Sequence, residues 1–195
     1  EIEAEIWHEF LRHRSRGPAF QTIVASGAES CTLHYVKNDK QCQDGDLALI
    51  DFGAEYANYA GDLTRTVPVN GRFTPRQRAV YDAVLRVQKA AIQMLRPGNP
   101  LEAYTADVGR WMEPELIGLG LLDKEKVKGQ PKDQPLYKKY FPHGASHHLG
   151  LDVHDYSDKF RPFEAGMVFT CEPGIYIREE GIGVRIENDI LITDQ

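Results

Sequence analysis

The stretch from Phe141 to Asp155 constrains the fold more than any other part of the chain. It holds four histidines within twelve residues, is bounded by glycines, and lies between apolar, strand-like segments. Neutral imidazole binds divalent metal ions through one ring nitrogen, so a cluster of this density is typical of a metal or proton-transfer centre. The fold must therefore bring partner groups to this segment from elsewhere in the chain.

Acidic residues recur where strand-like segments begin or end, and they are the candidates for those partners. The apolar run at 47–50 leads directly to Asp51, and the run at 167–171 leads to Glu172 in the same way. A carboxylate at the end of a buried strand costs free energy unless it is paired or bound to a metal. The candidate carboxylates are Asp51, Asp62, Glu172 and Glu187.

One histidine with four carboxylates offers more ligands than a single ion usually takes, so the sequence predicts two metal ions. The period of two in a strand places Asp62, Thr64 and Thr66 on one face, and we expect Thr64 to support Asp62. Taken alone, Asp51 and Asp62 are better explained as exposed turn residues of a hairpin. Together with the histidine cluster, a metal-binding role becomes the better explanation for both residues.

Size and composition bound the class of protein. A chain of 195 residues with 42% hydrophobic content is long enough for one sizeable core, so we expect a single domain over residues 1–195. The net charge of -6 is spread without a basic block, which argues against nucleic acid or an anionic membrane surface as a partner. No apolar run approaches the roughly 20 residues that cross a bilayer, and no charged-then-apolar leader begins the chain. The three cysteines form no CxxC pair and are odd in number, which favours reduced thiols and a cytoplasmic protein.

The remaining pattern predicts two long helices and several short strands. The chain opens at Glu1 inside an amphipathic helical pattern and without a methionine, so we expect a fragment of a longer protein. Thr74 and Pro75 are typical of a helix start, whereas Pro114 should kink a second helix or start a new segment. The expected elements are a helix over 1–13, strand-like runs at 22–25, 47–50, 63–69, 167–171 and 184–187, helices over 75–95 and 101–122, and a surface loop over 123–135.

Two local patterns leave alternatives open. The segment 33–35 follows a polar turn and allows an extended conformation, and His34 is equally compatible with a functional role and with a half-exposed structural one. Arg185 and Glu187 share one face of a strand-like run. A structural salt bridge explains this pair about as well as a functional role does.

Five stretches of the sequence resemble the catalytic domain of Xaa-Pro aminopeptidases. They read LHY at 33–35, DFGAEYANYAGDLTRT at 51–66, HGASHHLGLDVH at 143–154, EPG at 172–174 and GVRIEND at 183–189. These enzymes belong to the pita-bread metallopeptidases, with prolidase and methionine aminopeptidase as relatives. The resemblance covers nearly the whole chain. It implies an α+β fold, in which a curved antiparallel sheet carries helices on its outer face and the metals in its concavity.

The resemblance also implies a role for each candidate residue. Asp51 would chelate one ion, whereas Asp62 and Glu187 would bridge both. His147 and Glu172 would complete the ligand set, and Glu172 would also act as the general base. The side chains implied to line the substrate pocket, where they would hold the peptide carbonyl or stabilise the tetrahedral intermediate, are His34, His143 and His154.

The implied chemistry is amide hydrolysis at a dinuclear metal centre. Two divalent ions about 3.5 to 4 Å apart can share one hydroxide and aim it at a carbonyl that one ion polarises. Carboxylate-rich ligation favours Mn²⁺, as the resemblance does, while the single imidazole also admits Zn²⁺ or Co²⁺. The expected substrate is a peptide with proline at its second position, and related enzymes are commonly homo-oligomers.

Two other functions remain compatible with the sequence. A prolidase that cleaves only Xaa-Pro dipeptides is the nearest alternative, because the same metal site serves both enzymes. His148 stands where aminopeptidase P commonly has tryptophan, which leaves the ligand set intact but blurs the subfamily. The alternative from another class is a non-catalytic pita-bread binding module, as in histone chaperone subunits. Such modules lack the full ligand set, whereas all five candidate ligands are present here.

Overall fold

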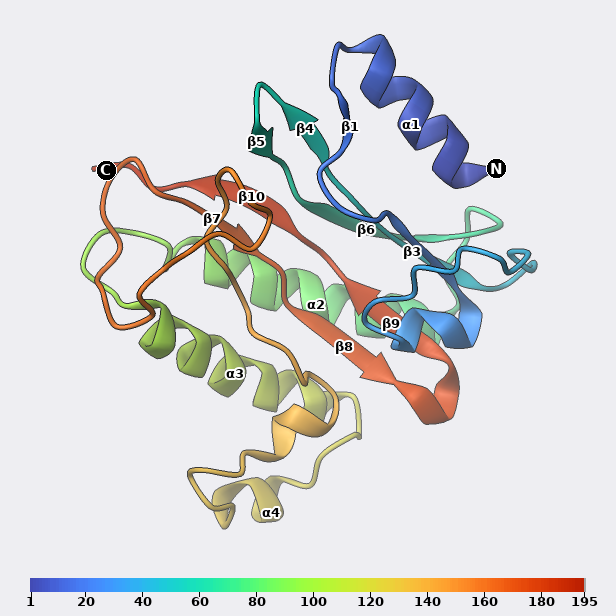
Figure 1. The fold of residues 1–195 in the computed structure, drawn as a ribbon. Coiled ribbons are helices and arrows are strands. Elements are labelled where there is room, and N and C mark those ends of the chain that lie inside the picture. Colours follow the sequence, from blue (N-terminus) through green and yellow to red (C-terminus); the bar gives the residue numbers. More distant parts are fainter. Residues whose placement is uncertain (195) are drawn as a thin grey trace.

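The computed structural model describes residues 1–194 as one arrangement of helices packed against antiparallel strands (Figure 1). Every strand pair in these residues runs antiparallel, as the α+β prediction requires. The two long helices, α2 (Pro75–Ile92) and α3 (Leu101–Gly118), lie on one side of the strands. Helix α1 (Ile2–Arg12) lies far from these two helices, at the other end of the molecule.

The N-terminal strands bring the first carboxylates together. Strand β2 (Ile23–Ser26) pairs with β3 (Leu47–Phe52), and β3 pairs with β6 (Leu63–Pro68), so that Asp51 lies opposite Thr64. Strands β1 (Gly17–Pro18), β4 (Ala54–Tyr56) and β5 (Tyr59–Ala60) form a second small sheet. Between the two sheets, a Cβ on Gly53 would lie 1.6 Å from the carbonyl oxygen of Gly61, so only glycine allows the backbones of residues 53 and 61 to approach this closely.

The long helices begin as their sequences predict. At the start of α2, the Thr74 hydroxyl accepts from the Gln77 amide at 3.2 Å, and the Gln77 side chain accepts from the Thr74 amide at 2.9 Å. This reciprocal pair is a capping box. Helix α3 runs without a break through Pro114, so the expectation of a new segment there is wrong. The helix is held by four fully buried side chains spaced four residues apart, namely Tyr104, Val108, Met112 and Leu116.

Two expectations about irregular segments are corrected by the structure. The region 123–135 is not wholly a loop, because α4 (Lys124–Lys128) forms there with the Asp123 carboxylate accepting from the Lys126 amide at 2.9 Å. Leu33 and His34 lie in a turn after the 3₁₀ helix Gly27–Cys31, not in an extended segment.

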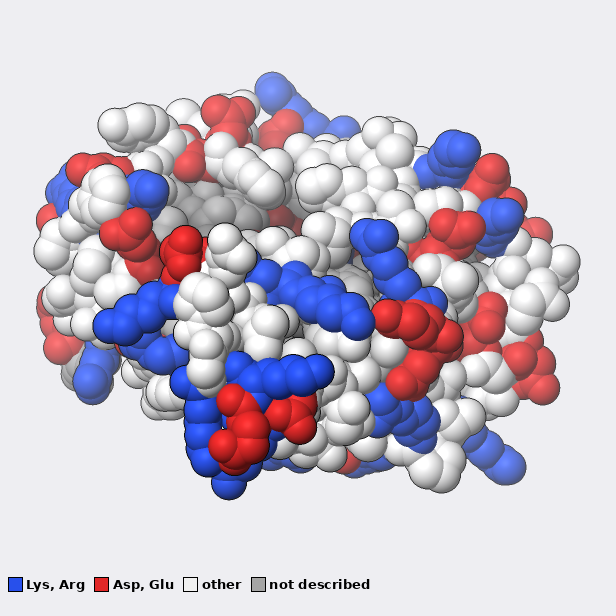
Figure 2. Space-filling view, turned by 90° about the horizontal axis from the view of Figure 1, so that it is seen from below, with Lys and Arg blue, Asp and Glu red and all other residues white. Residues whose placement is uncertain are grey.

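Seen from below in Figure 2, Lys and Arg side chains are intermixed with Asp and Glu on the surface.

The C-terminal strands separate the core from the cavity side of the sheet. Strand β7 (Val168–Cys171) pairs with β10 (Asn188–Leu191), and β8 (Gly174–Ile177) pairs with β9 (Ile182–Arg185). Alternate residues of these strands join α2 and α3 in the main hydrophobic core, which includes Phe169, Cys171, Ile175, Ile177, Ile182 and Val184. The residues between them point the other way, as the period of two demands.

A seam of hydrogen bonds joins β6 to the chain at 185–189. The Glu187 amide donates to the Thr64 carbonyl at 3.1 Å, which places the two segments side by side. Farther along β6, the Thr66 hydroxyl donates to the Arg185 carbonyl at 3.0 Å and accepts from its amide at 3.2 Å. The seam therefore connects the N-terminal and C-terminal strands and brings their carboxylates to one place.

Candidate metal centre

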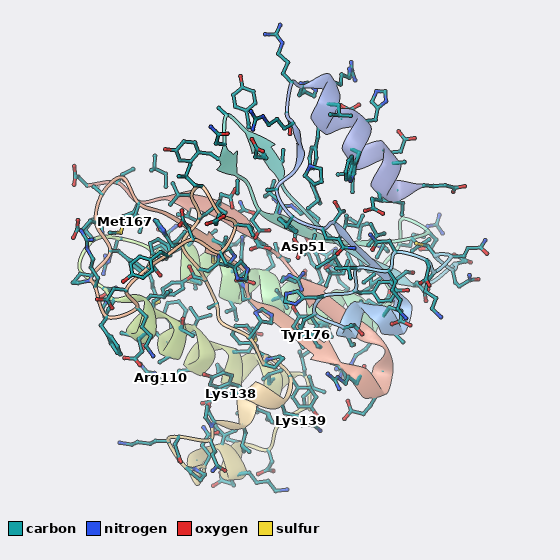
Figure 3. All side chains as sticks on the ribbon, in the orientation of Figure 1. Asp51, Arg110, Lys138, Lys139, Met167 and Tyr176 are labelled. Atoms are coloured by element: carbon teal, nitrogen blue, oxygen red, sulfur yellow. The ribbon has the colours of Figure 1, made fainter. Side chains whose placement is uncertain are left out.

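All eight residues predicted for the site line a single cavity of about 240 Å³. Asp51 lies in β3 and Asp62 directly precedes β6, whereas Glu172 and Glu187 follow β7 and β9. The remaining predicted residues in its wall are His34, His143, His147 and His154. In Figure 3 the labelled Asp51 lies in the interior between the strands, whereas Arg110, Lys138 and Lys139 lie toward the outer side near α3 and α4.

Asp51 and Asp62 each carry a buried oxygen that no hydrogen bond satisfies. The atoms are the two Oδ1 oxygens, and among residues 1–194 neither has a hydrogen-bond partner. Both side chains are buried, so water does not readily replace the missing donors. Unpaired buried carboxylate oxygens are costly, and a bound cation is the usual way in which such a cost is met.

His147 presents one ring nitrogen to the carboxylates. Its Nε2 lies 3.4 Å from Asp62 Oδ2 and 3.8 Å from Glu172 Oε1. The other ring nitrogen, Nδ1, lies 3.2 Å from the His148 carbonyl oxygen, to which it donates when it carries the proton. Metal-binding histidines typically have their second nitrogen held in this way. The ring is therefore oriented with Nε2 toward the cavity.

Ligand atoms of three residues are close enough to share an ion. One atom each from Asp62, His147 and Glu187 lie within 4.8 Å of one another. Glu187 is almost fully buried, and its Oε2 accepts a hydrogen bond from the Thr64 hydroxyl at 2.6 Å. The chemistry of this donor set, together with the two unsatisfied oxygens of the aspartates, fits divalent metal ions.

Thr64 contacts a different carboxylate from the one the sequence suggested. Its hydroxyl donates to Glu187, and the expectation that it supports the Asp62 side chain is wrong. Glu187 lies between β9 and β10, in a segment that is hydrogen-bonded to β6, so the Thr64 side chain contacts that segment rather than Asp62. Asp62 instead receives support through its backbone, because its amide donates to Asp189 Oδ2 at 3.1 Å.

Arg185 is the cation nearest to the cluster, and its main partner is Asp51. Its Nη2 donates to Asp51 Oδ2 at 2.6 Å, while its Nε lies 4.0 Å from Glu187 Oε2. The guanidinium also donates to the Tyr176 hydroxyl at 2.9 Å. The Arg185–Glu187 pair considered from the sequence is therefore the weaker contact. Tyr176 and Asp189 were missed, although the period of two placed both on this side of their strands.

Burial dominates the ionisation of the carboxylates when no metal is bound. It raises the pKa of Asp51 to about 6, although Arg185 opposes the shift. Burial likewise raises the pKa of Glu172 to about 7, and it raises the pKa of Glu187 well above its ordinary value, with Glu172 and Asp62 adding to the effect. Four carboxylates against one guanidinium leave the cluster short of positive charge.

The other histidines occupy distinct places around this cluster. His143 Nε2 lies 2.8 Å from the Tyr176 hydroxyl, and burial together with Arg185 lowers the pKa of His143 to about 4. The ring of His154 lies against that of His147, with centroids 4.1 Å apart. His148 points elsewhere, because its ring packs on Phe169 at 5.1 Å between centroids. His148 is therefore not among the residues that line the cavity.

A second cavity of about 290 Å³ adjoins the first and extends it. The two share four residues of the cluster, namely His34, Asp51, Asp62 and His154. Its remaining wall is largely apolar and consists of Phe20, Gln21, Ile23, Val36 and Val153. A small apolar group of a ligand could therefore lie beside the acidic centre.

Residues 1–194 match the sequence profile of metallopeptidase family M24. The chain belongs to this family. It is 48% identical over its full length to a Xaa-Pro aminopeptidase of Haemophilus influenzae, of which it covers 47%. A Xaa-Pro aminopeptidase of Escherichia coli is 47% identical over 99% of the chain, which covers 46% of that protein. The chain thus spans about half the length of the curated relatives it matches.

Solved structures of M24 relatives confirm the pita-bread prediction. Zinc-substituted Escherichia coli aminopeptidase P in complex with product superimposes with a TM-score of 0.91 at 46% identity, covering 100% of this chain and 46% of that one. Proline aminopeptidase P II from Yersinia pestis gives a TM-score of 0.90 at 46% identity, covering 100% of this chain and 47% of that one. The predicted resemblance to Xaa-Pro aminopeptidases is therefore confirmed.

Proposed function

We propose that residues 1–195 form the catalytic domain of a metallo-aminopeptidase that removes an N-terminal residue preceding proline. The observation that carries the proposal is the pair of buried Oδ1 oxygens on Asp51 and Asp62, which have no hydrogen-bond partner among residues 1–194. They lie in one cavity with the other proposed ligands. The similarity to named Xaa-Pro aminopeptidases over the whole chain supports the reaction and the substrate class.

The proposed ligands divide between two ions. Asp51 would hold one ion, Asp62 and Glu187 would bridge both, and the set would be completed by His147 and Glu172. Bound divalent ions would supply Lewis-acid activation of a water molecule and of the scissile carbonyl. Carboxylate-rich ligation favours Mn²⁺ as our first choice, with Zn²⁺ or Co²⁺ as alternatives. The zinc-substituted Escherichia coli aminopeptidase P shows that a similar protein accepts zinc.

The chain's own residues would position the peptide and move the proton. Glu172 lies in the cavity wall, with its Oε2 3.7 Å from His143 Nδ1 and its Oε1 3.8 Å from His147 Nε2. There it would accept a proton from the attacking water as general base. His143 and His154 would donate hydrogen bonds to the peptide carbonyl or to the oxygen that becomes negative during attack. His34, in the turn that both cavities share, would line the pocket for the substrate.

The apolar cavity beside the cluster supports a peptide rather than a charged small molecule as substrate. Its lining of Phe20, Ile23, Val36 and Val153 would accept an aliphatic side chain or a proline ring. A prolidase would share the same metal site but would accept only dipeptides. The named relatives favour the aminopeptidase.

The location and assembly of the intact protein are part of the same proposal. The three cysteines are unpaired, which supports the reducing cytoplasm. No helix within residues 1–194 has the length and hydropathy to span a membrane. We propose a homo-oligomer for the intact protein, by analogy with related enzymes.

Metal analysis combined with a series of peptides tests the function. We expect the intact protein to hold two divalent ions per chain and to release the first residue from Xaa-Pro peptides of three or more residues. Cleavage of Xaa-Pro dipeptides alone would identify a prolidase. A folded protein that binds no divalent metal and cleaves none of these peptides would instead support a binding module.

A further inference from the structure

Two short segments of the metal centre contact each other in the same way, and each supports the proposed bridging residue of the other. Residues 62–64 and 187–189 run antiparallel across the seam, joined by the bond from the Glu187 amide to the Thr64 carbonyl at 3.1 Å. Each segment starts with a carboxylate proposed to bridge the metals. Two positions later each has a polar residue that contacts the bridging residue of the other segment, namely Thr64 and Asp189.

Thr64 has only one way to arrange its hydroxyl. The oxygen accepts from Arg185 Nε at 3.0 Å, and the arginine can only donate. The single hydroxyl hydrogen is therefore directed at Glu187 Oε2, 2.6 Å away. Thr64 is completely buried, so no water can substitute for this donor. Glu187 is thus held by one oxygen before any metal arrives.

Asp189 acts on the opposite segment through the backbone. Its Oδ2 accepts from the Asp62 amide at 3.1 Å, which fixes the point from which the Asp62 side chain leaves the strand. The Asp62 carboxylate itself remains available, because its Oδ1 has no hydrogen-bond partner among the described residues. The contact therefore orients the ligand without occupying it.

We propose that Thr64 and Asp189 form a reciprocal cross-strand support that presets both bridging carboxylates for metal binding. They are positioning residues, since each acts through a ligand and neither lines the metal cavity. The inference rests on the proposed function for the assignment of Asp62 and Glu187 as ligands. Replacing a residue that hydrogen-bonds to a metal ligand without binding the metal itself typically lowers metal affinity by about 10- to 100-fold.

Thr66 provides a matched control for Thr64. It lies on the same face of β6, is buried to a similar degree, and also has a doubly bonded hydroxyl. Both of its bonds go to the backbone of Arg185 rather than to a ligand side chain. Thr64→Val and Thr66→Val therefore remove equivalent groups from equivalent surroundings, and only the first removes support from Glu187.

The first experiment titrates Mn²⁺ into the metal-free intact protein by calorimetry and records thermal unfolding of each variant. We expect Thr64→Val to weaken Mn²⁺ binding by about 10- to 100-fold. Thr64→Ser keeps the hydroxyl and should bind Mn²⁺ nearly as the parent does. Thr66→Val should lose stability but keep parental affinity. Parental affinity in Thr64→Val, or an equal loss in Thr66→Val, would overturn the role of Thr64.

The second experiment compares two replacements of Asp189 by the same titration. Asp189→Asn keeps a side-chain oxygen that can accept from the Asp62 amide, whereas Asp189→Ala removes the acceptor. We expect the alanine variant to lose about 10- to 100-fold in Mn²⁺ affinity and the asparagine variant to remain close to the parent. Equal weakening in both would show that the charge of Asp189, rather than its hydrogen bond, matters, and would overturn the positioning role.

These outcomes separate the inference from the proposed function. If the parent itself binds no divalent metal, the proposed function and the reciprocal support are both refuted. If the parent binds two ions and cleaves Xaa-Pro peptides while Thr64→Val and Asp189→Ala bind metal equally well, only the reciprocal support is refuted.

Discussion

The two faces of the C-terminal strands differ completely in chemistry although they share one backbone. On the side toward α2 and α3, Phe169 and Val184 are buried in the apolar core. One residue further along the same strands, Thr170 and Arg185 contact residues of the carboxylate cluster. The period of two thus places a stabilising core directly behind a costly site.

This comparison shows how the fold tolerates three buried carboxylates, Asp51, Asp62 and Glu187, beside a partly buried fourth, Glu172. Burial of apolar side chains stabilises the folded state by roughly 25 cal/mol per Å², and the helix side of the sheet provides such burial. The cavity side destabilises the folded state when no metal is bound, because the carboxylates there are costly to bury and burial raises the pKa of Asp51 and Glu172. Stability should therefore depend on the core, and metal binding on the cavity side.

Replacing Glu187 by alanine is expected to have the largest effect, because it removes one of the carboxylates proposed to bridge both ions. Glu187→Ala should lose both metals together and abolish hydrolysis, while the apolar core keeps the protein folded. Elemental analysis and circular dichroism on the same preparation measure this. Glu164→Ala, at an exposed residue that pairs with Arg161, is the control. One ion still tightly bound in Glu187→Ala would rule out the bridging role.

Removal of the metals should reverse the pH dependence of stability. Folding raises the pKa of Asp51 to about 6 and that of Glu172 to about 7, mainly by burial. The metal-free native state then binds protons more tightly than the unfolded chain, so its stability is greatest below about pH 4 and falls as the pH rises to about 7. Metal binding requires ionised ligands, so the metal-bound form should gain stability over the same range.

Thermal unfolding at pH 5 and pH 7, with Mn²⁺ or with a chelator, measures both trends. The difference in melting temperature between the two forms should be larger at pH 7. A chelated protein that is more stable at pH 7 than at pH 5 would contradict the view that the cavity side is destabilising without metal.

His154 tests whether the cavity side contains residues that act on the substrate without binding metal. Its ring lies against that of His147, yet it is seven residues farther along the chain and belongs to the cavity wall. If it donates to the oxygen that becomes negative during attack, His154→Ala should lower kcat by about 10²-fold or more and leave metal content unchanged. The exposed His8 offers a control substitution. Near-normal kcat with full metal would refute the role.

The sequence predicted local elements, and which residues lie near the site, better than it predicted which side chains contact one another. The helix start at Thr74 and Pro75 and the strand that leads into Asp51 follow from local chemistry and periodicity, and both are confirmed. The predicted partner of Thr64 was wrong and the contact of Arg185 with Asp51 was missed, because the observed contacts join residues 123 and 134 positions apart. Periodicity assigns a side chain to a face of a strand, but it does not say which strand lies next to it.

The irregular segments failed for a related reason. His34 lies in the cavity wall, but its segment forms a turn after the 3₁₀ helix Gly27–Cys31 instead of an extended segment. The short α4 depends on the Asp123 cap rather than on any apolar stripe, so its hydrophobic pattern gave no signal. In both cases the conformation is decided by single hydrogen bonds and neighbouring elements, to which patterns of hydrophobicity are insensitive.

The smallest expected effect comes from the core face of β8, one residue away from the cavity. Ile175 is fully buried against the core, while the adjacent Tyr176 lies on the other side of the strand and contacts His143 and Arg185. Ile175→Val removes one methyl group and should cost about 0.5 to 1.5 kcal/mol in the free energy of unfolding. Chemical denaturation measures this cost, and titration with Mn²⁺ and peptide kinetics measure the site. We expect metal affinity and kcat to be unchanged, because a methyl-sized cavity can be absorbed by side chains of α2 and α3 without moving the backbone. A loss of metal affinity larger than the loss of stability would show that packing on one face sets ligand geometry on the other, and the two faces could then no longer be treated as independent.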